Sequence, residues 1–214
     1  MRRLVVLNFL VILYFYSLVS LCLSEDANNE FDFAMKLYNE ENYLNAVVEF
    51  KRFVFLNPKN LRSNEAQFLI GQSLVKAEKY ELAIKELEKC ISLYSETSWN
   101  IKSRYKIGEI HFAQKEYDSA RIVFTDVLQK DEKKLISDKT QFMIARTCLY
   151  EKKWGRAAKE FEKVHENYPA SVLSPIAKEM AKQSQAGEQL SHRSPLFSGI
   201  ISAILPGAGQ AYCG

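Results

Sequence analysis

Large apolar side chains recur along the chain with a fixed period of 37 residues. In each copy an aromatic residue is followed three positions later by Ala, and a large apolar residue stands four positions after that Ala. The four copies are Tyr43, Ala46 and Phe50; Tyr80, Ala83 and Leu87; Tyr117, Ala120 and Phe124; and Trp154, Ala157 and Phe161. Spacings of three and four place side chains on one face of an α-helix, and a period of this length is typical of repeat proteins. The pattern therefore predicts an all-α array of stacked repeats.

Each copy is predicted to contain two helices, because a further stripe of apolar residues precedes the motif. A small residue stands twelve positions before each motif Ala, where it allows close helix approach, at Ala34, Gly71, Gly108 and Ala145. A short turn separates the two helices, at Glu41-Asn42, Glu78-Lys79, Lys115-Glu116 and Lys152-Lys153. The predicted helices are 28–40, 43–56, 62–77, 80–94, 99–114, 117–130, 135–151 and 154–167.

The motif resembles that of a tetratricopeptide repeat. The family has Leu-Gly, then an aromatic residue, then Ala and Phe, and the second copy here has Ile70-Gly71, Tyr80, Ala83 and Leu87. The resemblance implies a right-handed solenoid of four helix pairs over residues 25–170, with repeats at 28–58, 62–95, 99–132 and 135–169. The period is longer than the common 34 residues. An early Trp of the family is also absent, and its place is taken by Glu30, Gln67, Arg104 and Gln141.

Two further segments follow the repeats. Residues 171–191 combine one apolar face with a polar remainder, which predicts a capping helix at the end of the array. Residues 192–214 form an apolar tail with prolines and glycines, and this tail resembles the start of a small bacterial membrane domain. Its apolar run, 196–205, is about half as long as a membrane-spanning helix requires. We therefore interpret residues 192–214 as a truncated membrane segment.

The first 24 residues differ from the repeats in composition. Two arginines precede an apolar run over residues 4–23, and acidic residues begin at Glu25. This order is typical of a secretory signal peptide that is cleaved after Ser24. Two alternatives stay open: an uncleaved N-terminal anchor, and lipidation at Cys22. Repeats of this longer kind resemble those of exported bacterial envelope proteins, so we expect an exported protein that is periplasmic or membrane-associated.

The net charge and the cysteine content argue against several classes of function. The formal net charge is +3, and it falls to +1 when the two arginines of residues 1–24 are removed. A near-neutral chain lacks the basic surface that nucleic-acid binding requires. The cysteines form neither a close, even framework nor a CxxC pair, so we predict no disulfide scaffold, no metal site and no cofactor.

One pair of residues, His111 and Cys148, has the chemistry of a base and a nucleophile. They occupy equivalent positions in adjacent first helices, where the other repeats have Leu37 and Leu74. Such a position packs between helices, so we interpret both residues as packing residues and predict no enzyme activity. An enzyme hypothesis would require His111, Cys148 and an acid to meet in one pocket.

The first helix of each repeat carries the candidate binding residues. An aromatic residue recurs at one position of these helices, and core packing is its default interpretation. The resemblance implies instead that this position and its neighbours line a concave groove that binds a peptide or a partner helix. The candidate groove residues are Phe31, Met35, Tyr38, Phe68, Gln72, Val75, Tyr105, Glu109, Phe112, Phe142, Arg146 and Leu149.

The favoured hypothesis is a non-catalytic scaffold for protein–protein interaction in the bacterial cell envelope. The alternative is a repeat domain attached to a membrane-embedded C-terminal element, in which the function resides. Membrane association would use residues 4–23 or residues 195–214.

Overall fold

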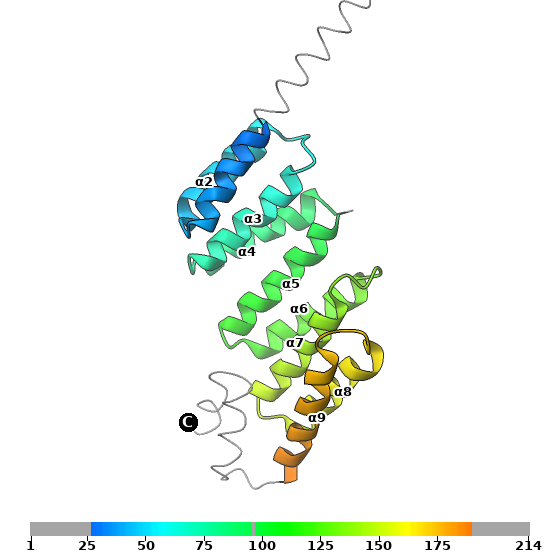
Figure 1. The fold of residues 1–214 in the computed structure, drawn as a ribbon. Helices are drawn as coiled ribbons and strands as arrows, with labels where there is room; N and C mark the ends of the chain where they lie inside the picture. Colours follow the sequence, from blue (N-terminus) through cyan, green and yellow to red (C-terminus); the bar gives the residue numbers. More distant parts are fainter. Residues whose placement is uncertain (1–26, 96, 190–214) are drawn as a thin grey trace, which may run out of the picture. The chain divides into compact units, whose positions relative to one another are not determined.

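The computed structural model describes residues 27–95 and 97–189, and every element of regular structure within them is an α-helix (Figure 1). The first helix covers residues 27–39. It is followed by α2 (Tyr43–Leu56), α3 (Ser63–Lys76), α4 (Tyr80–Leu93), α5 (Ser98–Ala113), α6 (Tyr117–Lys130), α7 (Ser137–Tyr150), α8 (Trp154–Asn167) and α9 (Ser174–Gln189). Each predicted helix is present, with ends within three residues of the predicted ones. The all-α fold class is confirmed for this part of the chain.

The helices belong to two compact units, Met1–Leu93 and Tyr94–Gly214. In the first unit, α2 packs against α3 and α3 packs against α4. In the second unit, packing runs from α5 through α6, α7 and α8 to α9, so each helix contacts the next one in the chain. Packing between neighbours in sequence is what stabilises repeat proteins.

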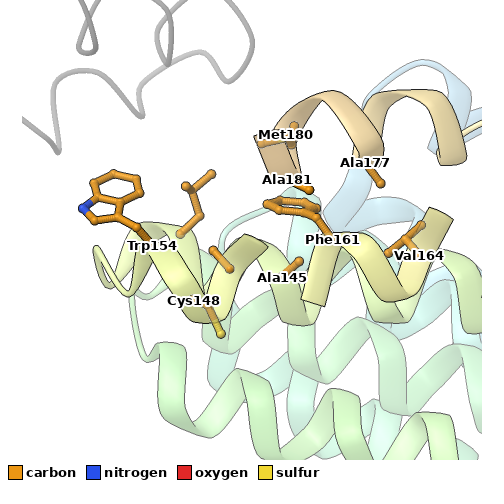
Figure 2. Packing of buried hydrophobic residues seen from close by; sticks show 10 residues of the cluster. Ala145, Cys148, Trp154, Phe161, Val164, Ala177, Met180 and Ala181 are labelled. Atoms are coloured by element: carbon orange, nitrogen blue, oxygen red, sulfur yellow. The ribbon is translucent and has the colours of Figure 1, made fainter. Parts of the chain in front are cut away.

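The repeated motif forms the core of each helix pair. The helices α2, α4, α6 and α8 each begin at the motif aromatic residue. All four motif alanines are fully buried, and so is the large residue four positions after each of them. Figure 2 shows the fourth copy, where Phe161 lies among Ala145 of α7 and Ala177 and Ala181 of α9. Burying each of these large side chains contributes about 1.5–3 kcal/mol to stability.

Two glycines bring the first helix of a repeat close to the second. A Cβ atom added to Gly71 would lie 2.6 Å from the Cγ atom of Leu87. A Cβ atom added to Gly108 would lie 2.6 Å from Cε1 of the Phe124 ring. Both distances are shorter than van der Waals contact, so the large side chain rests directly on the glycine backbone. The prediction that small residues permit close approach is confirmed at these two positions.

The turns inside the four helix pairs each place one non-glycine residue in the left-handed region. The φ angles of Glu41, Glu78, Lys115 and Lys152 are 59°, 57°, 64° and 61°. In the third turn, the backbone N–H of Glu116 donates to the carbonyl of His111 at 2.9 Å, and that of Lys115 donates to Phe112 at 3.0 Å. This pair of bonds is a Schellman motif, which satisfies the last carbonyl groups of a helix. The other three turns contain the same pair, which confirms the predicted turn positions.

Polar residues that replace the expected Trp link the two helices of a repeat. The Gln67 Nε2 atom donates to Glu86 Oε2 at 3.1 Å and to the Glu86 backbone carbonyl at 3.0 Å. At the same repeat positions two copies later, Gln141 Nε2 donates to Glu160 Oε2 at 2.8 Å. Buried polar groups are tolerated when they satisfy each other in this way. In these repeats a polar contact between the two helices therefore replaces the packing of the family's Trp.

Several sequence predictions concern segments outside the described residues. The signal peptide or anchor over 1–24 lies there, and so does the apolar tail over 192–214. Among the described residues, no helix is both long enough and apolar enough to cross a membrane.

Replacing Lys115 with Gly is expected to stabilise the protein by about 1 kcal/mol, because Gly adopts a φ of 64° without steric penalty. The thermal midpoint measured by circular dichroism should rise by about 2–4 °C for a chain of this size. Lys85 lies exposed within α4 and provides the control, since Lys85→Gly should destabilise by about 1 kcal/mol. A lower midpoint for Lys115→Gly would contradict the left-handed turn.

Replacing Gly108 with Val is expected to destabilise the protein by about 2 kcal/mol, because the new side chain collides with the ring of Phe124. Urea unfolding measures the loss. Ala113 is exposed at the end of the same helix, so Ala113→Val should change stability by about 0.5 kcal/mol or less. Equal stabilities of Gly108→Val and wild type would show that α5 and α6 do not depend on this contact.

Candidate functional site

The first-helix residues that the sequence singles out divide into a buried group and a partly exposed group. Phe31, Phe68 and Leu149 are buried. The others keep part of their surface in solvent: Met35, Tyr38, Gln72, Val75, Tyr105, Glu109, Phe112, Phe142 and Arg146. The partly exposed group is the one that can contact a partner without rearrangement of the core.

The recurring aromatic position of the first helices packs toward the second helix of its own repeat. The ring centroids of Phe31 and Phe50 lie 5.5 Å apart, and those of Phe142 and Phe161 lie 5.3 Å apart. Both pairs meet edge to face, which is the favoured geometry for aromatic side chains. These rings therefore contribute to helix packing, and their role as the floor of a groove stays a prediction.

Arg146 of α7 connects side chains of α5 and α7 in the second unit. Its guanidinium carbon lies 4.8 Å from the ring centroid of Phe112 and 5.8 Å from that of Tyr150. The Phe112 and Tyr150 centroids lie 5.1 Å apart, with an angle of 85° between the rings. The Nη1 atom of Arg146 also lies 3.4 Å from Sδ of Met143. Contacts with aromatic faces hold a guanidinium in place without neutralising its charge.

The charge of Arg146 has no counterion among the described residues. Arg52, Arg62, Arg104 and Arg121 each lie 4.0 Å or less from a carboxylate oxygen. No described carboxylate lies that close to Arg146, and its Nε atom is buried without a hydrogen-bond partner in this part of the chain. A buried donor that lacks an acceptor is destabilising. The uncompensated charge of its partly exposed guanidinium suits Arg146 to bind an acidic group of another molecule.

Tyr105 and Glu109 of α5 add a hydroxyl and a carboxylate near Arg146. Burial raises the pKa of Tyr105 far above its usual value, and the neighbouring Glu109 raises it further, while Arg146 partly opposes the shift. The hydroxyl therefore stays protonated at physiological pH and remains a hydrogen-bond donor. Lys106 Nζ donates to Glu109 Oε2 at 2.5 Å. The half-exposed surface around Arg146 thus contains a positive charge, a negative charge and a hydroxyl group beside aromatic rings.

The predicted groove residues of the first unit are all uncharged. The rings of Tyr38 and Tyr43 lie 5.6 Å apart, and burial raises the pKa of Tyr38. Gln72 and Val75 of α3 are half-buried. The charged members of the predicted set, Glu109 and Arg146, both lie in the second unit.

Sequence reasoning did not identify Tyr150, which contacts both Phe112 and Arg146. The equivalent positions in the other repeats are Asn39, Lys76 and Ala113, so the period provides no signal for an aromatic residue here. The contact depends on side chains of two helices that are separated by α6 in the chain.

His111 and Cys148 have different partners in the structure. The Nδ1 atom of His111 lies 2.7 Å from Oε2 of Glu116, in the turn that follows its own helix. Cys148 is fully buried in the apolar cluster of α7, α8 and α9 (Figure 2), and burial raises the pKa of its thiol. A buried thiol with a raised pKa is a poor nucleophile. The interpretation of Cys148 as a core residue is confirmed.

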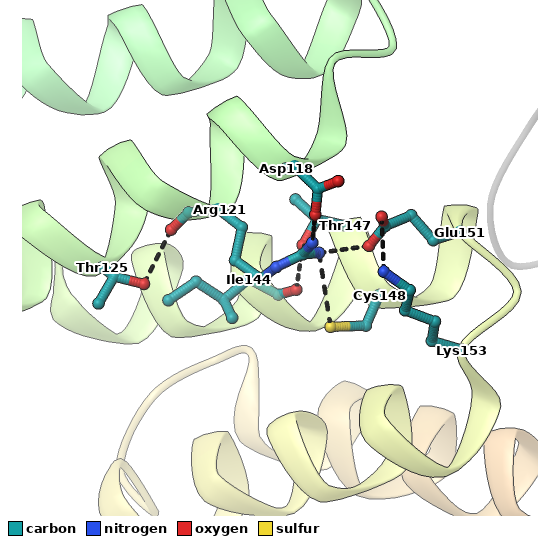
Figure 3. Close-up of polar contacts among 8 residues, drawn as sticks. All are labelled: Asp118, Arg121, Thr125, Ile144, Thr147, Cys148, Glu151 and Lys153. Carbon is teal, nitrogen blue, oxygen red and sulfur yellow. Dashed lines mark hydrogen bonds and ion pairs between the residues drawn. The ribbon is translucent and has the colours of Figure 1, made fainter.

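A buried cation, Arg121, connects α6 to α7 through polar contacts (Figure 3). Its guanidinium donates to the carboxylates of Asp118 and Glu151 and, at 3.1 Å, to Oγ1 of Thr147. Burial acts to raise the pKa of Glu151, but hydrogen bonds from Arg121 and Lys153 outweigh it and lower that pKa. The charge of Arg121 is therefore neutralised within the protein, which makes this residue structural.

The described residues contain no group of three His, Cys, Asp or Glu side chains that could hold a metal ion. A hollow of about 700 Å³ lies at the start of α8, beside Lys153, Arg156 and Lys159. It is open to solvent, and basic side chains form much of its lining.

Comparison with known protein families identifies two of the repeats. Residues 65–97 and residues 102–133 each match a family model described as a tetratricopeptide repeat. These two segments are thus similar to tetratricopeptide repeats. They correspond to the second and third of the four copies that the sequence predicts. Stacked repeats of this kind present extended surfaces to other proteins, which suits a scaffold for protein–protein interaction.

Solved structures show the same fold. A tetratricopeptide repeat protein from Parabacteroides merdae ATCC 43184 has 11% identity and a TM-score of 0.60, over 85% of this chain and 67% of that one. The pilF protein of Pseudomonas aeruginosa has 15% identity and a TM-score of 0.58, over 88% of this chain and 89% of its own. YrrB, a TPR protein with an unusual peptide-binding site, has 17% identity and a TM-score of 0.53, over 85% and 88% of the two chains. No curated protein matches the sequence.

Replacing Glu151 with Gln is expected to destabilise the protein by about 2 kcal/mol at pH 7, because Arg121 then loses a neutralising charge. The pKa of Glu151 is lowered by folding, so its contribution is complete above the ordinary value of 4.5 and is lost as pH falls through the folded-state pKa. Urea unfolding of both proteins should therefore show a difference that shrinks below about pH 5. A difference that stays constant down to pH 2 would contradict the ion pair.

Proposed function

We propose that this protein is a non-catalytic scaffold that binds a partner protein on the surface of its first helices. The observation that supports this most directly is Arg146, which is held against Phe112 and Tyr150 and has no counterion among the described residues. The other arginines described here that are not fully exposed, Arg62, Arg104 and Arg121, each have a carboxylate nearby. An unsatisfied cation between aromatic rings is a feature of recognition sites, because Arg and aromatic residues contribute strongly to binding.

The chemistry around Arg146 favours a partner segment that carries an acidic residue beside an apolar one. A carboxylate would accept hydrogen bonds from the guanidinium, and the adjacent apolar group would cover the rings of Phe112 and Tyr150. Glu109 can accept from a backbone N–H of the same segment, and the oxygen of the Tyr105 hydroxyl can accept from a second one. An extended peptide or the exposed face of a helix would meet these requirements.

We also propose that the scaffold works in a bacterial envelope, as an exported periplasmic or membrane-associated protein. Two sequence features support this location: the arginines and apolar run of residues 1–23, and the apolar tail of residues 192–214. The repeats would then hold another envelope protein in place. In the alternative, the function resides in a membrane-embedded element that includes residues 192–214.

Selection of random dodecapeptides displayed on phage tests the binding surface without a known partner. The wild-type protein is expected to enrich sequences in which Asp or Glu stands next to an apolar residue. Arg146→Gln should weaken binding of the selected peptides by at least about tenfold, because it removes the charged donor. Arg156 of α8 is exposed and lies outside the first helices, so Arg156→Gln is the matched control and should leave binding unchanged.

Affinities are measured by fluorescence anisotropy with synthetic versions of the selected peptides, after circular dichroism has shown that both variants are folded. Failure to enrich any peptide above immobilised matrix would argue against peptide binding. Equal losses of peptide affinity for Arg146→Gln and Arg156→Gln would attribute the effect to the overall charge of the protein and not to the surface around Arg146.

A further inference from the structure

One face of α2 is apolar and exposed almost from end to end. The exposed fractions of Leu44, Val48 and Phe55 are 54%, 60% and 83%. At 3.6 residues per turn, these three positions and Lys51 lie within about 60° of one another around the helix axis and extend over about 16 Å along it. The four residues therefore form one continuous surface, which we call the α2 stripe.

The second helices of the other repeats do not have such a face. The positions equivalent to the α2 stripe are Glu81, Lys85, Glu88 and Ser92 in the second copy; Asp118, Ile122, Thr125 and Gln129 in the third; and Gly155, Lys159, Glu162 and Glu166 in the fourth. Ile122 is the single large apolar side chain among them. The repeat fold thus does not require apolar residues at these positions, and an exposed group of them marks a contact with another molecule.

Lys51 does not add an unpaired charge to the α2 stripe. Its Nζ atom lies 2.7 Å from Oε1 of Glu86, a carboxylate that is largely buried. The ammonium group is therefore neutralised within the protein. The aliphatic part of the Lys51 side chain, which is half exposed, remains available for apolar contact.

The spacing of the α2 stripe is the same when it is read from either end. Its positions are separated by four, three and four residues, which is the spacing by which side chains of two packed helices interdigitate. A second α2 stripe in antiparallel orientation therefore matches it in register, with Leu44 opposite Phe55 of the second copy and Val48 opposite Lys51. A two-fold axis would relate the two copies, so that each contact occurs twice.

Charges at the two ends of α2 favour the antiparallel orientation. Glu40 and Glu41 precede the helix, Lys59 follows it, and all three are exposed. Antiparallel pairing brings Lys59 of each copy to the acidic start of α2 in the other copy, whereas parallel pairing brings like charges together. The α2 stripe and its flanking residues are therefore complementary to themselves in both spacing and charge.

We infer that the α2 stripe is the contact surface for a second copy of this protein, which binds through its own α2 in antiparallel orientation. One pair of 14-residue helices should bury less than the roughly 800 Å² per partner of a standard interface, so the dimer should be weak and dependent on concentration. Two copies would present two surfaces around Arg146, and a partner with two recognition segments would bind more tightly through both. The α2 stripe lies in the first unit and Arg146 in the second, so each can be altered separately.

Cross-linking between cysteine variants of the full chain tests the partner and the orientation together. All variants have Cys22→Ser and Cys213→Ser, and the cysteines that remain are buried. Leu44→Cys and Phe55→Cys proteins are purified separately in non-ionic detergent, mixed, and treated with a short bis-maleimide cross-linker. Denaturing gel electrophoresis is expected to show dimer in the mixture and little dimer with either variant alone, because antiparallel pairing places position 44 opposite position 55.

The second repeat provides matched controls. Glu81→Cys and Ser92→Cys occupy the same repeat positions in α4 as the test pair, both residues are exposed, and their mixture is expected to give little dimer. Adding Val48→Asp to both members of the test pair should lower the dimer yield at least about tenfold, because a carboxylate then replaces an apolar contact at the middle of the stripe. Lys85→Asp is its equivalent in α4 and should leave the yield unchanged. Circular dichroism checks that every variant is folded.

Several results would overturn the inference. Equal dimer yields for the 44/55 and 81/92 mixtures would indicate random collision and not a specific contact. Dimer formed mainly by Leu44→Cys alone would indicate parallel pairing. A purified 44/55 mixture without dimer would contradict a second copy, and a cross-link to a protein of another mass in cells would then assign the α2 stripe to a different partner. None of these results depends on peptide binding at Arg146.

Discussion

Each helix pair of this protein depends on one contact, in which a large side chain of the second helix rests on a small residue of the first. Leu87 on Gly71 and Phe124 on Gly108 are the closest cases, because a Cβ atom at either glycine would overlap the opposing side chain. The motif Ala lies four residues before the large side chain and is also fully buried, which keeps the second helix against its neighbours. The left-handed turn between the helices follows from the same requirement, since the chain must reverse within two or three residues to form this contact.

Most charged and amide side chains in the packed regions are paired inside the protein. Gln67 with Glu86 and Arg104 with Asp126 join the helices of their repeats, and Arg121 is neutralised by two carboxylates. Such pairing is expected, because an unpaired charge in a region of low dielectric constant is strongly destabilising. Arg146 has no carboxylate partner among the described residues. The side chains around it therefore indicate a function more directly than its position in the repeat does.

The two units of the described chain offer different surfaces. The second unit presents charge beside aromatic rings, around Arg146 and Tyr105, and this combination suits recognition of a polypeptide. In the first unit the predicted groove residues are uncharged, and Phe55 and Leu61 are exposed at the end of α2 and in the loop after it. Repetition of one motif does not produce four equal surfaces, because the period constrains buried positions and leaves the exposed ones free to differ.

The sequence alone determined the helices, the turns and the buried motif residues. These depend on hydrogen bonds and side-chain spacing within about ten residues, and the same pattern repeated at 37-residue intervals makes the signal unambiguous. The tertiary structure decided which first-helix residues are available to a partner. Phe31 is buried because Phe50 and Arg62 cover its ring, and Arg146 is held by Phe112 and Tyr150, which come from different helices. Contacts between residues so far apart in the chain depend on how whole helices pack, and no local pattern in the sequence encodes them.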